Sequence, residues 1–152
     1  MKLKDIIKYF CKNYPYKQEL SKARLTKMVY LADWKKSLVS GKQMTNLQWK
    51  YNHYGPYIEE VINQIRNDDN FSVKKTTNFY GNFKEIISLI SNKCSVELED
   101  DDKKILDFII EKTAPKSWSD FIKLVYSTYP IATMPKGSFL DLPELAKKYK
   151  SS

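Results

Sequence analysis

Cysteine and histidine are scarce in this chain of 152 residues, which holds two cysteines and one histidine. A structural zinc site ordinarily takes four Cys or His ligands in paired spacings, and the cysteines here form no Cys-x-x-Cys pair. We therefore expect no metal and no cofactor. Cys11 and Cys94 are expected to be reduced thiols of a cytoplasmic protein.

Glycine and proline are also few, at four and six residues, which is unlike collagen or linker sequence. The glycines stand at positions 41, 55, 81 and 137. They are too far apart for either glycine-rich phosphate-binding motif, GxGxxG or Walker A. Nucleotide-binding loops of these two kinds are therefore excluded.

Long apolar runs are missing as well. No stretch approaches the ~20 apolar residues of a membrane span, and residues 1–11 lack the apolar centre of a signal peptide. A hydrophobic share of 42% argues against disorder. The length suits one compact domain, which we expect over residues 1–150, with residues 151–152 as a frayed end.

Arginine supplies only two of the 26 cations, although the formal net charge is +8. The positive excess is concentrated in residues 1–50, which carry twelve Lys or Arg against three Asp or Glu. Base and phosphate recognition favour the guanidinium group, so a lysine surface is a weak sign of nucleic-acid binding. Solvated lysine faces and a basic face that attracts an acidic partner both remain open.

The single histidine limits nucleophilic catalysis, because a Cys–His or Ser–His pair would have to use His53. Cys11 follows Phe10 on the apolar side of a predicted helix and is expected in the core. His53 stands at a strand end, where its ring nitrogens are expected to bond backbone groups of the turn. We predict no catalytic residue and no enzyme activity.

Apolar periodicity predicts a mainly helical α+β single domain with a small, about three-stranded, antiparallel sheet, in the order ααβαββαα(α). Residues 47–51 alternate at period two and predict a strand, and residues 71–77 and 83–90 predict a hairpin around a loop with Gly81. The predicted helices cover residues 2–12, 18–39 and 56–67, the segment opened by the acidic run 97–102, residues 117–130, and a short segment from residue 141.

Three positions carry signals of helix ends. Gly41 is expected as a left-handed cap at the end of the second helix. Pro56 is expected at the first position of the third helix. Ser117, with Asp120 three residues later, resembles a capping box that opens the fifth helix.

Aromatic residues are abundant, with eleven tyrosines, three tryptophans and seven phenylalanines, and several gather in residues 49–57. Tyrosine and tryptophan are enriched at protein interfaces, which favours a binding module over a catalyst. Two alternatives stay open, namely half-buried rings that pack on helices and rings that stack on single-stranded nucleic acid.

An ordered set of short motifs runs through residues 25–56. Residues 25–33 read Leu-Thr-Lys-Met-Val-Tyr-Leu-Ala-Asp, residues 41–45 read Gly-Lys-Gln-Met-Thr, and residues 54–56 read Tyr-Gly-Pro. This order resembles the SocA-like antitoxin family, also called the Panacea domain, most strongly over residues 20–66. The positions that fit the family pattern, joined by His53 and Tyr54, are expected to form a scaffold; they are Leu25, Lys27, Tyr30, Asp33, Gly41, Thr45, Gly55 and Pro56.

The resemblance implies an antitoxin of a bacterial or phage toxin–antitoxin system, which neutralises a cognate protein toxin from an adjacent gene by direct protein–protein binding. Two alternatives are a nucleic-acid-binding regulator and a proteolytic adaptor that delivers a toxin to a protease. No membrane partner is expected.

The scaffold and the surface are expected to have separate roles. Tyr30 and Asp33 lie three residues apart on one helix face and are expected to tie the second helix to the strand near His53. Contacts to the partner are expected from basic residues of the second helix and from neighbouring aromatics, namely Lys22, Lys27, Lys35, Lys36, Trp49, Tyr51 and Tyr57.

Overall fold

The protein is built around one central helix, α2. The structure is a computed structural model that describes residues 2–77, 81, 83–91 and 93–151. Its seven α-helices and four strands are α1 (Lys2–Asn13), α2 (Lys22–Ser40), β1 (Lys50–Asn52), β2 (Gly55–Tyr57), α3 (Glu59–Arg66), β3 (Phe71–Thr77), β4 (Phe83–Leu89), α4 (Asp100–Thr113), α5 (Trp118–Ser127), α6 (Tyr129–Thr133) and α7 (Leu142–Ser151). None of the described helices is long and apolar enough to cross a membrane.

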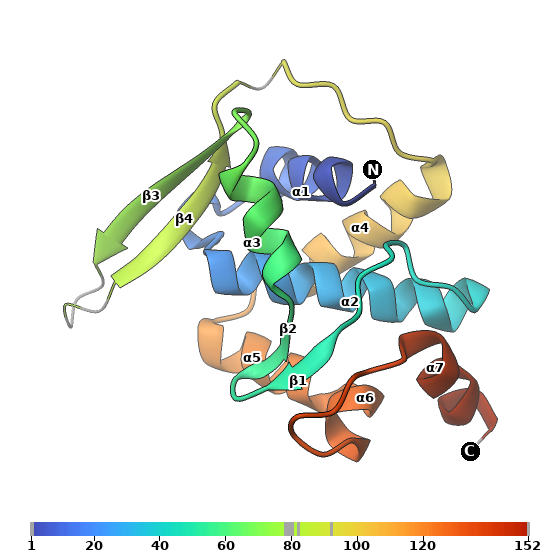
Figure 1. The fold of residues 1–152 in the computed structure, drawn as a ribbon. Coiled ribbons are helices and arrows are strands. Elements are labelled where there is room, and N and C mark those ends of the chain that lie inside the picture. The colour runs from blue at the N-terminus through green and yellow to red at the C-terminus, as the bar shows by residue number, and fades with distance from the viewer. Residues whose placement is uncertain (1, 78–80, 82, 92, 152) are drawn as a thin grey trace.

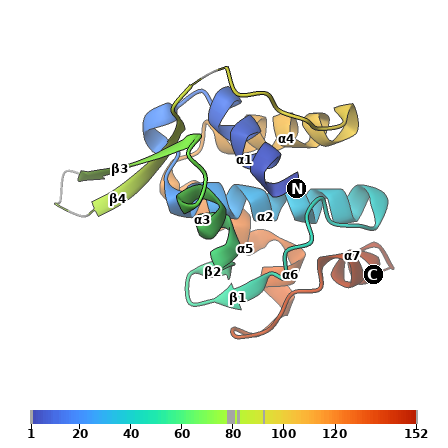
Figure 2. The same cartoon turned by 45° about the horizontal axis from the view of Figure 1, so that its top comes forward.

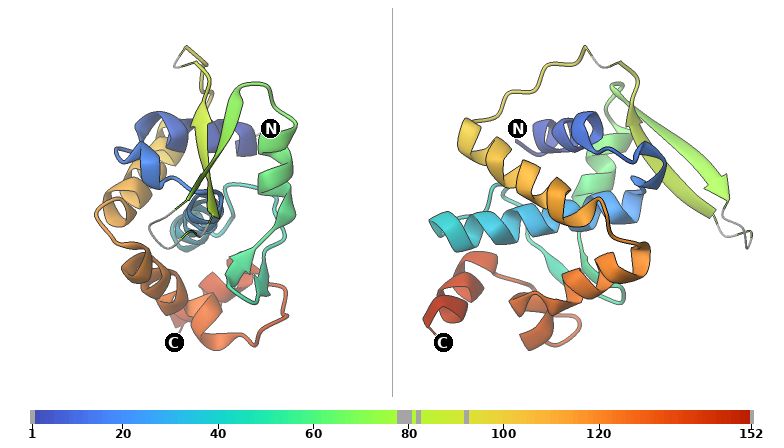
Figure 3. Two further views of the ribbon diagram at one scale, coloured as in Figure 1. Left: turned by 90° about the vertical axis from the view of Figure 1, so that its left-hand side faces the viewer. Right: turned by 180° about the vertical axis from the view of Figure 1, so that it is seen from behind.

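The other elements surround α2 (Figures 1 and 3). Helices α1 and α4 lie on one side, α5 to α7 on a second, and α3 with the β1–β2 hairpin on a third. Because α2 is enclosed in this way, its residues from Arg24 to Trp34 are all buried. The largest fully buried side chains of the core include Trp49, Tyr14, Tyr30, Phe10 and Phe121. Burial of one such side chain contributes about 1.5–3 kcal/mol. The mainly helical α+β architecture agrees with the sequence prediction.

Ser21 and Gly41 delimit α2. The Ser21 hydroxyl accepts a hydrogen bond from the Arg24 backbone N–H at 3.1 Å, as an N-cap does. Gly41 has φ +76° and donates its N–H to the Ser37 carbonyl at 2.9 Å, which confirms the predicted C-cap. The predicted start at residue 18 is too early, because a separate 3-10 turn, Lys17–Glu19, precedes Ser21.

The pair Gly55 and Pro56 belongs to strand β2, so the prediction that Pro56 opens a helix is wrong. Strands β1 and β2 pair antiparallel along their whole length. Proline fits here because β2 pairs with a strand on one side only, so its backbone N–H groups are not all needed for the sheet. Helix α3 begins at Glu59, after the extended residue Ile58.

The four strands form two separate sheets of two strands each, whereas a sheet of about three strands was expected. Strands β3 and β4 pair antiparallel, which confirms the predicted hairpin, and they project from the helical body (Figure 2). Most of the loop that joins them, residues 78–80 and 82, lies outside the described residues. The base of this hairpin is attached beside α2, where the Ile87 N–H donates to the Leu20 carbonyl at 3.0 Å. The free edge of β1 instead meets the segment after α6, because the Tyr51 N–H donates to the Ser138 carbonyl at 2.9 Å.

The C-terminal helices differ in detail from the prediction. The Ser117 hydroxyl accepts from the Asp120 N–H at 3.2 Å, which confirms the N-cap of α5. Helix α5 ends at Ser127, and Pro130 lies in the first turn of the short helix α6. Helix α7 continues to Ser151, the residue where a frayed end was expected, and residue 152 lies outside the described residues.

The acidic residues in the first turn of α4 do more than complement the helix dipole. Asp102 is fully buried and accepts hydrogen bonds from the ammonium groups of Lys36 at 2.8 Å and Lys2 at 3.1 Å. Burial acts to raise the pKa of this carboxyl, but the two lysine bonds outweigh burial and hold the pKa below its ordinary value. Asp102 thereby ties α4 to both α1 and α2.

This ion pair predicts a pH-dependent stability. We expect Asp102→Asn to lower the free energy of unfolding at neutral pH by about 1–3 kcal/mol. The lowered folded-state pKa means that the carboxylate's contribution is complete above the unfolded-state pKa of about 4 and disappears as the pH falls through the folded-state pKa. Urea denaturation of both proteins from neutral to acid pH should therefore give curves that converge at low pH. The exposed neighbour Asp101, replaced by Asn, serves as the control, and a gap that stays constant at all pH values would contradict the assignment.

Candidate functional site

The carboxylate of Asp33 lies at the centre of the family-pattern residues. Its side chain is fully buried. One oxygen accepts from the Thr45 backbone N–H at 2.9 Å, and the other accepts from the Thr45 hydroxyl at 2.6 Å and from the Trp49 indole N–H at 2.8 Å. These bonds fasten the segment between Gly41 and β1 to the middle of α2.

The partners of Asp33 among the described residues are neutral N–H and O–H groups. Burial raises the pKa of the Asp33 carboxyl, and the hydrogen bonds from Thr45 and Trp49 act in the opposite direction by stabilising the charged form. A buried carboxylate without a cation depends on such donors for its stability. The segment carrying Thr45 and Trp49 is therefore held in one position relative to α2.

Tyr30 supports the same region from a second direction. Its ring packs edge-on against Trp49, with ring centroids 5.6 Å apart. Its hydroxyl lies 2.8 Å from the Thr128 hydroxyl, which itself donates to the Val125 carbonyl, so Tyr30 is the donor of this bond. Tyr30 thus links α2 to the end of α5.

The expectation that Tyr30 and Asp33 tie α2 to the strand near His53 is met by Asp33 but not by Tyr30. Asp33 accepts from Trp49, which lies in the strand predicted over residues 47–51, although the observed strand β1 begins at Lys50. Tyr30 bonds instead to Thr128. His53 is exposed, and its backbone N–H donates to the Asn52 side chain at 2.9 Å. Within the described part of the chain, the ring nitrogens of His53 form no hydrogen bond that holds the turn.

Gly55 allows the β1–β2 hairpin to approach α5. It is buried and has φ +101°, a conformation that side chains other than glycine's rarely adopt. A Cβ added at Gly55 would lie 3.0 Å from Cε1 of Tyr126 and 3.6 Å from Cε of Lys27. Tyr126 also packs near Tyr51, with ring centroids 6.5 Å apart. Gly55 is therefore the point where the hairpin, α5 and α2 meet.

Two further family-pattern residues of α2 are buried, and they differ in chemistry. Leu25 is a core residue. Lys27 is only 4% exposed, and burial lowers the pKa of its ammonium group. A basic residue of the pattern thus lies inside the fold, directly below Gly55.

A family model described as "Antitoxin SocA-like, Panacea domain" matches residues 25–130 of this chain, which is more than half of its length. The chain belongs to the SocA-like antitoxin family. The match begins at Leu25, covers the whole buried arrangement around Asp33 and Gly55, and ends in α6. Comparison with curated proteins and with solved structures finds no match.

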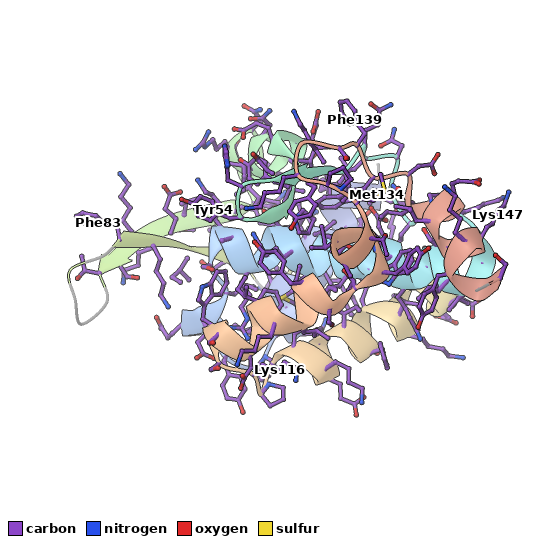
Figure 4. All side chains as sticks on the ribbon, turned by 90° about the horizontal axis from the view of Figure 1, so that it is seen from below. Tyr54, Phe83, Lys116, Met134, Phe139 and Lys147 are labelled. Carbon is purple, nitrogen blue, oxygen red and sulfur yellow. The ribbon has the colours of Figure 1, made fainter. Side chains whose placement is uncertain are left out.

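Most residues that the resemblance assigns to a scaffold lie within the Panacea fold. Tyr54 does not. Its side chain is 83% exposed at the β1–β2 turn and contributes no core packing (Figure 4). Pro56 and Thr45 lie within the fold, whereas Gly41 is exposed and serves only to end α2.

The four lysines expected to form a basic, partner-binding face do not share a face. Lys22 lies 3.9 Å from a carboxylate oxygen of Glu85, and the ammonium group of Lys35 lies 4.6 Å from the ring centre of Phe108. With 3.6 residues per helical turn, positions 22, 27, 35 and 36 are distributed around the axis of α2. Lys36 is committed to the buried Asp102, so its charge reversal would damage the fold before it tested partner binding.

The aromatic partner candidates also separate into buried and accessible residues. Trp49 is fully buried against Asp33 and Tyr30, which corrects its assignment as a contact residue. Tyr51 and Tyr57 remain half-buried at the hairpin, and the Tyr57 hydroxyl donates to Glu59. That hydrogen bond, together with burial, raises the pKa of Tyr57 to about 12.

Several exposed aromatics were missed by the sequence reading. A groove of about 680 Å³ lies between the start of α2, the β3–β4 hairpin and the start of α5. Phe83, 77% exposed, and Trp118, 48% exposed, line it. Phe139, in the segment beside β1, is exposed as well. Of these residues, only the exposure of Trp118 could have been predicted from the sequence. Trp118 directly follows the N-cap Ser117 and lies outside the apolar stripe of α5.

The described residues contain no cluster of three or more His, Cys, Asp or Glu side chains that could hold a metal ion. Cys11 is buried, and burial raises the pKa of its thiol to about 12, which disfavours the reactive thiolate. The arrangement around Asp33 positions the segment carrying Thr45 and Trp49 against α2.

Replacing Asp33 by Asn should destabilise the Panacea domain strongly. The amide keeps one acceptor oxygen and places its own N–H groups against the donors of Thr45 and Trp49. We expect the free energy of unfolding to fall by about 2–4 kcal/mol in urea denaturation. Asp69→Asn, at an exposed carboxyl, is the matched control and should change it by less than about 0.5 kcal/mol. Equal effects of the two variants would refute the role given to Asp33.

Gly55→Ala should cost more stability than Gly41→Ala. Both glycines have positive φ, but an added Cβ at Gly41 meets no atom within 4 Å. We expect about 1–2 kcal/mol of extra destabilisation at Gly55 from the contact with Tyr126. Thermal and urea denaturation measure it, and the excess should shrink when Tyr126→Ala removes the ring. An excess that is unchanged in this background would contradict the proposed close approach.

Proposed function

We propose that this protein is an antitoxin that neutralises a cognate protein toxin by direct protein–protein binding. Its membership of the SocA-like antitoxin family supports an antitoxin role and is the observation that carries the proposal. That neutralisation proceeds by direct binding is supported by which residues are buried and which are exposed.

Three family-pattern residues of α2, Leu25, Tyr30 and Asp33, lie in the interior and hold the fold. Large apolar side chains are left on the outside, which is the composition that protein interfaces use. Among the described residues, those with the greatest exposure are Tyr54, Phe83, Phe139, Ile90 and Val39. Exposed on a folded scaffold, each of these side chains is available to a folded partner.

The basic residues favour a protein partner over nucleic acid. A nucleic-acid surface requires cations gathered along one face or groove. The lysines of α2 are instead spread around the helix, and Lys22 and Lys36 are paired with carboxylates. The net charge of +8 remains compatible with an acidic protein partner.

Co-expression tests the proposal. The reading frame next to this gene is expressed alone and together with this protein, and growth is measured. We expect the neighbour to arrest growth alone, growth to recover on co-expression, and the two proteins to co-purify as a stable complex. The same complex should form when the two proteins are purified separately and then mixed.

Three outcomes would overturn direct neutralisation. One is soluble expression of both proteins with neither rescue nor complex. Another is rescue that requires a host protease and removes the toxin from the cell, which would indicate an adaptor. The third is salt-sensitive binding of this protein to DNA or RNA at the toxin's own promoter or transcript, with no toxin complex.

A further inference from the structure

Lys27 differs from the other lysines of α2 in having no partner. Lys22 pairs with Glu85, Lys36 pairs with Asp102, and Lys35 lies over the Phe108 ring. Lys27 is the most buried of the four, at 4% exposed, yet within the described part of the chain its ammonium group makes no hydrogen bond or ion pair.

An unpaired ammonium group in this position costs stability. Moving a charge out of water without a compensating partner is unfavourable, and burial correspondingly lowers the pKa of Lys27. A methionine would fill the same space without that cost, because its side chain has similar length and no charge. Packing therefore does not explain why a lysine occupies this position.

The tip of Lys27 reaches the surface next to aromatic residues. The buried polar atoms that lack a hydrogen-bond partner in the described structure are on Tyr14, Arg24 and Asp68, and Lys27 Nζ is not among them, so it keeps contact with the outside. Its stem passes beneath Gly55, where a Cβ would come within 3.6 Å of Lys27 Cε. The absence of a side chain at Gly55 leaves this passage open.

The surroundings of Lys27 form what we call the Lys27 patch, which comprises Lys27, Tyr51, Tyr54, Gly55 and Tyr126. Tyr126 lies 3.0 Å from the same added Cβ, and Tyr51 packs on Tyr126. Tyr54 lies on the β1–β2 turn beside α2, on the side of the molecule shown in Figure 4. The patch thus combines one cation with three tyrosine rings and includes no carboxylate.

We propose that the Lys27 patch receives a carboxylate of the toxin, with an Asp or Glu side chain of the toxin pairing with the Lys27 ammonium group inside the rim of tyrosines. This inference rests on the proposed function of direct toxin binding. In the complex, the toxin surface together with the neighbouring tyrosine rings would shield this ion pair from water, and shielding strengthens a charge-assisted bond. Binding would supply the partner that Lys27 lacks in the free protein, so part of the cost carried by the free fold is recovered in the complex.

The test separates stability from binding. Lys27→Met removes the charge and retains the packing, and Lys104→Met at an exposed position of α4 is the matched control. We expect Lys27→Met to be at least as stable as the wild type in urea denaturation. Its Kd for the purified toxin should rise about 30-fold or more, the effect of removing one partner of a desolvated charge pair. Lys104→Met should bind as the wild type does.

A double-mutant cycle and a chemical footprint complete the test. Among Asp→Asn and Glu→Gln variants of the toxin, one should weaken binding to the wild type but not to Lys27→Met. In acetic anhydride labelling followed by mass spectrometry, Lys27 should react in the free protein and be protected in the complex. This second measurement keeps the proposal testable even where Lys27→Met folds poorly.

These experiments distinguish failure of toxin binding as a whole from failure of the role proposed for Lys27. Wild-type protein that binds no toxin would defeat the proposed function itself. Wild-type protein that binds the toxin, with Lys27→Met binding equally well or Lys27 labelled equally in the free and bound states, would overturn the Lys27 inference alone. Loss of oligonucleotide binding in Lys27→Met, with toxin binding intact, would also overturn it and assign the patch to nucleic acid.

Discussion

The buried carboxylate of Asp33 is the interaction on which the rest of this structure depends. It accepts three hydrogen bonds from Thr45 and Trp49, and so fixes the chain that leaves α2 against the middle of that helix. The β1–β2 hairpin follows directly, and its position against α5 is set by Gly55. A polar anchor can do this because a buried acid tolerates only those arrangements that satisfy both of its oxygens.

The polar residues of the enclosed helix α2 have two kinds of role. Most of its residues hold neighbouring elements, including two lysines that pair with acids from the β3–β4 hairpin and α4. Among the four lysines of α2 named above, Lys27 is the one for which the described residues supply neither a carboxylate nor an aromatic ring facing its ammonium group. In the proposed toxin complex, a carboxylate of the toxin would pair with the Lys27 ammonium group, which the fold leaves without a partner. The fold would in this way contribute directly to partner binding.

Helices were largely predictable from the sequence because their signals are local. Leu3, Ile6 and Phe10 follow one helical stripe, and Gly41 ends α2 as its backbone freedom allows. Strand β2 and helix α6 were missed because Pro56 and Pro130 are compatible with several local conformations. Only the hydrogen bonds made by neighbouring segments decide between them.

The sequence by itself determined the helical character, the hairpin of residues 71–89 and, through the order of its motifs, the antitoxin family. The tertiary structure alone decided which side chains are available to a partner. Trp49 and Lys36, both expected at the surface, serve the fold, whereas Tyr126 and Trp118 reach solvent. The physical reason is that exposure depends on what packs against a residue from distant parts of the chain, and a helix surrounded on all sides has no free face for periodicity to reveal.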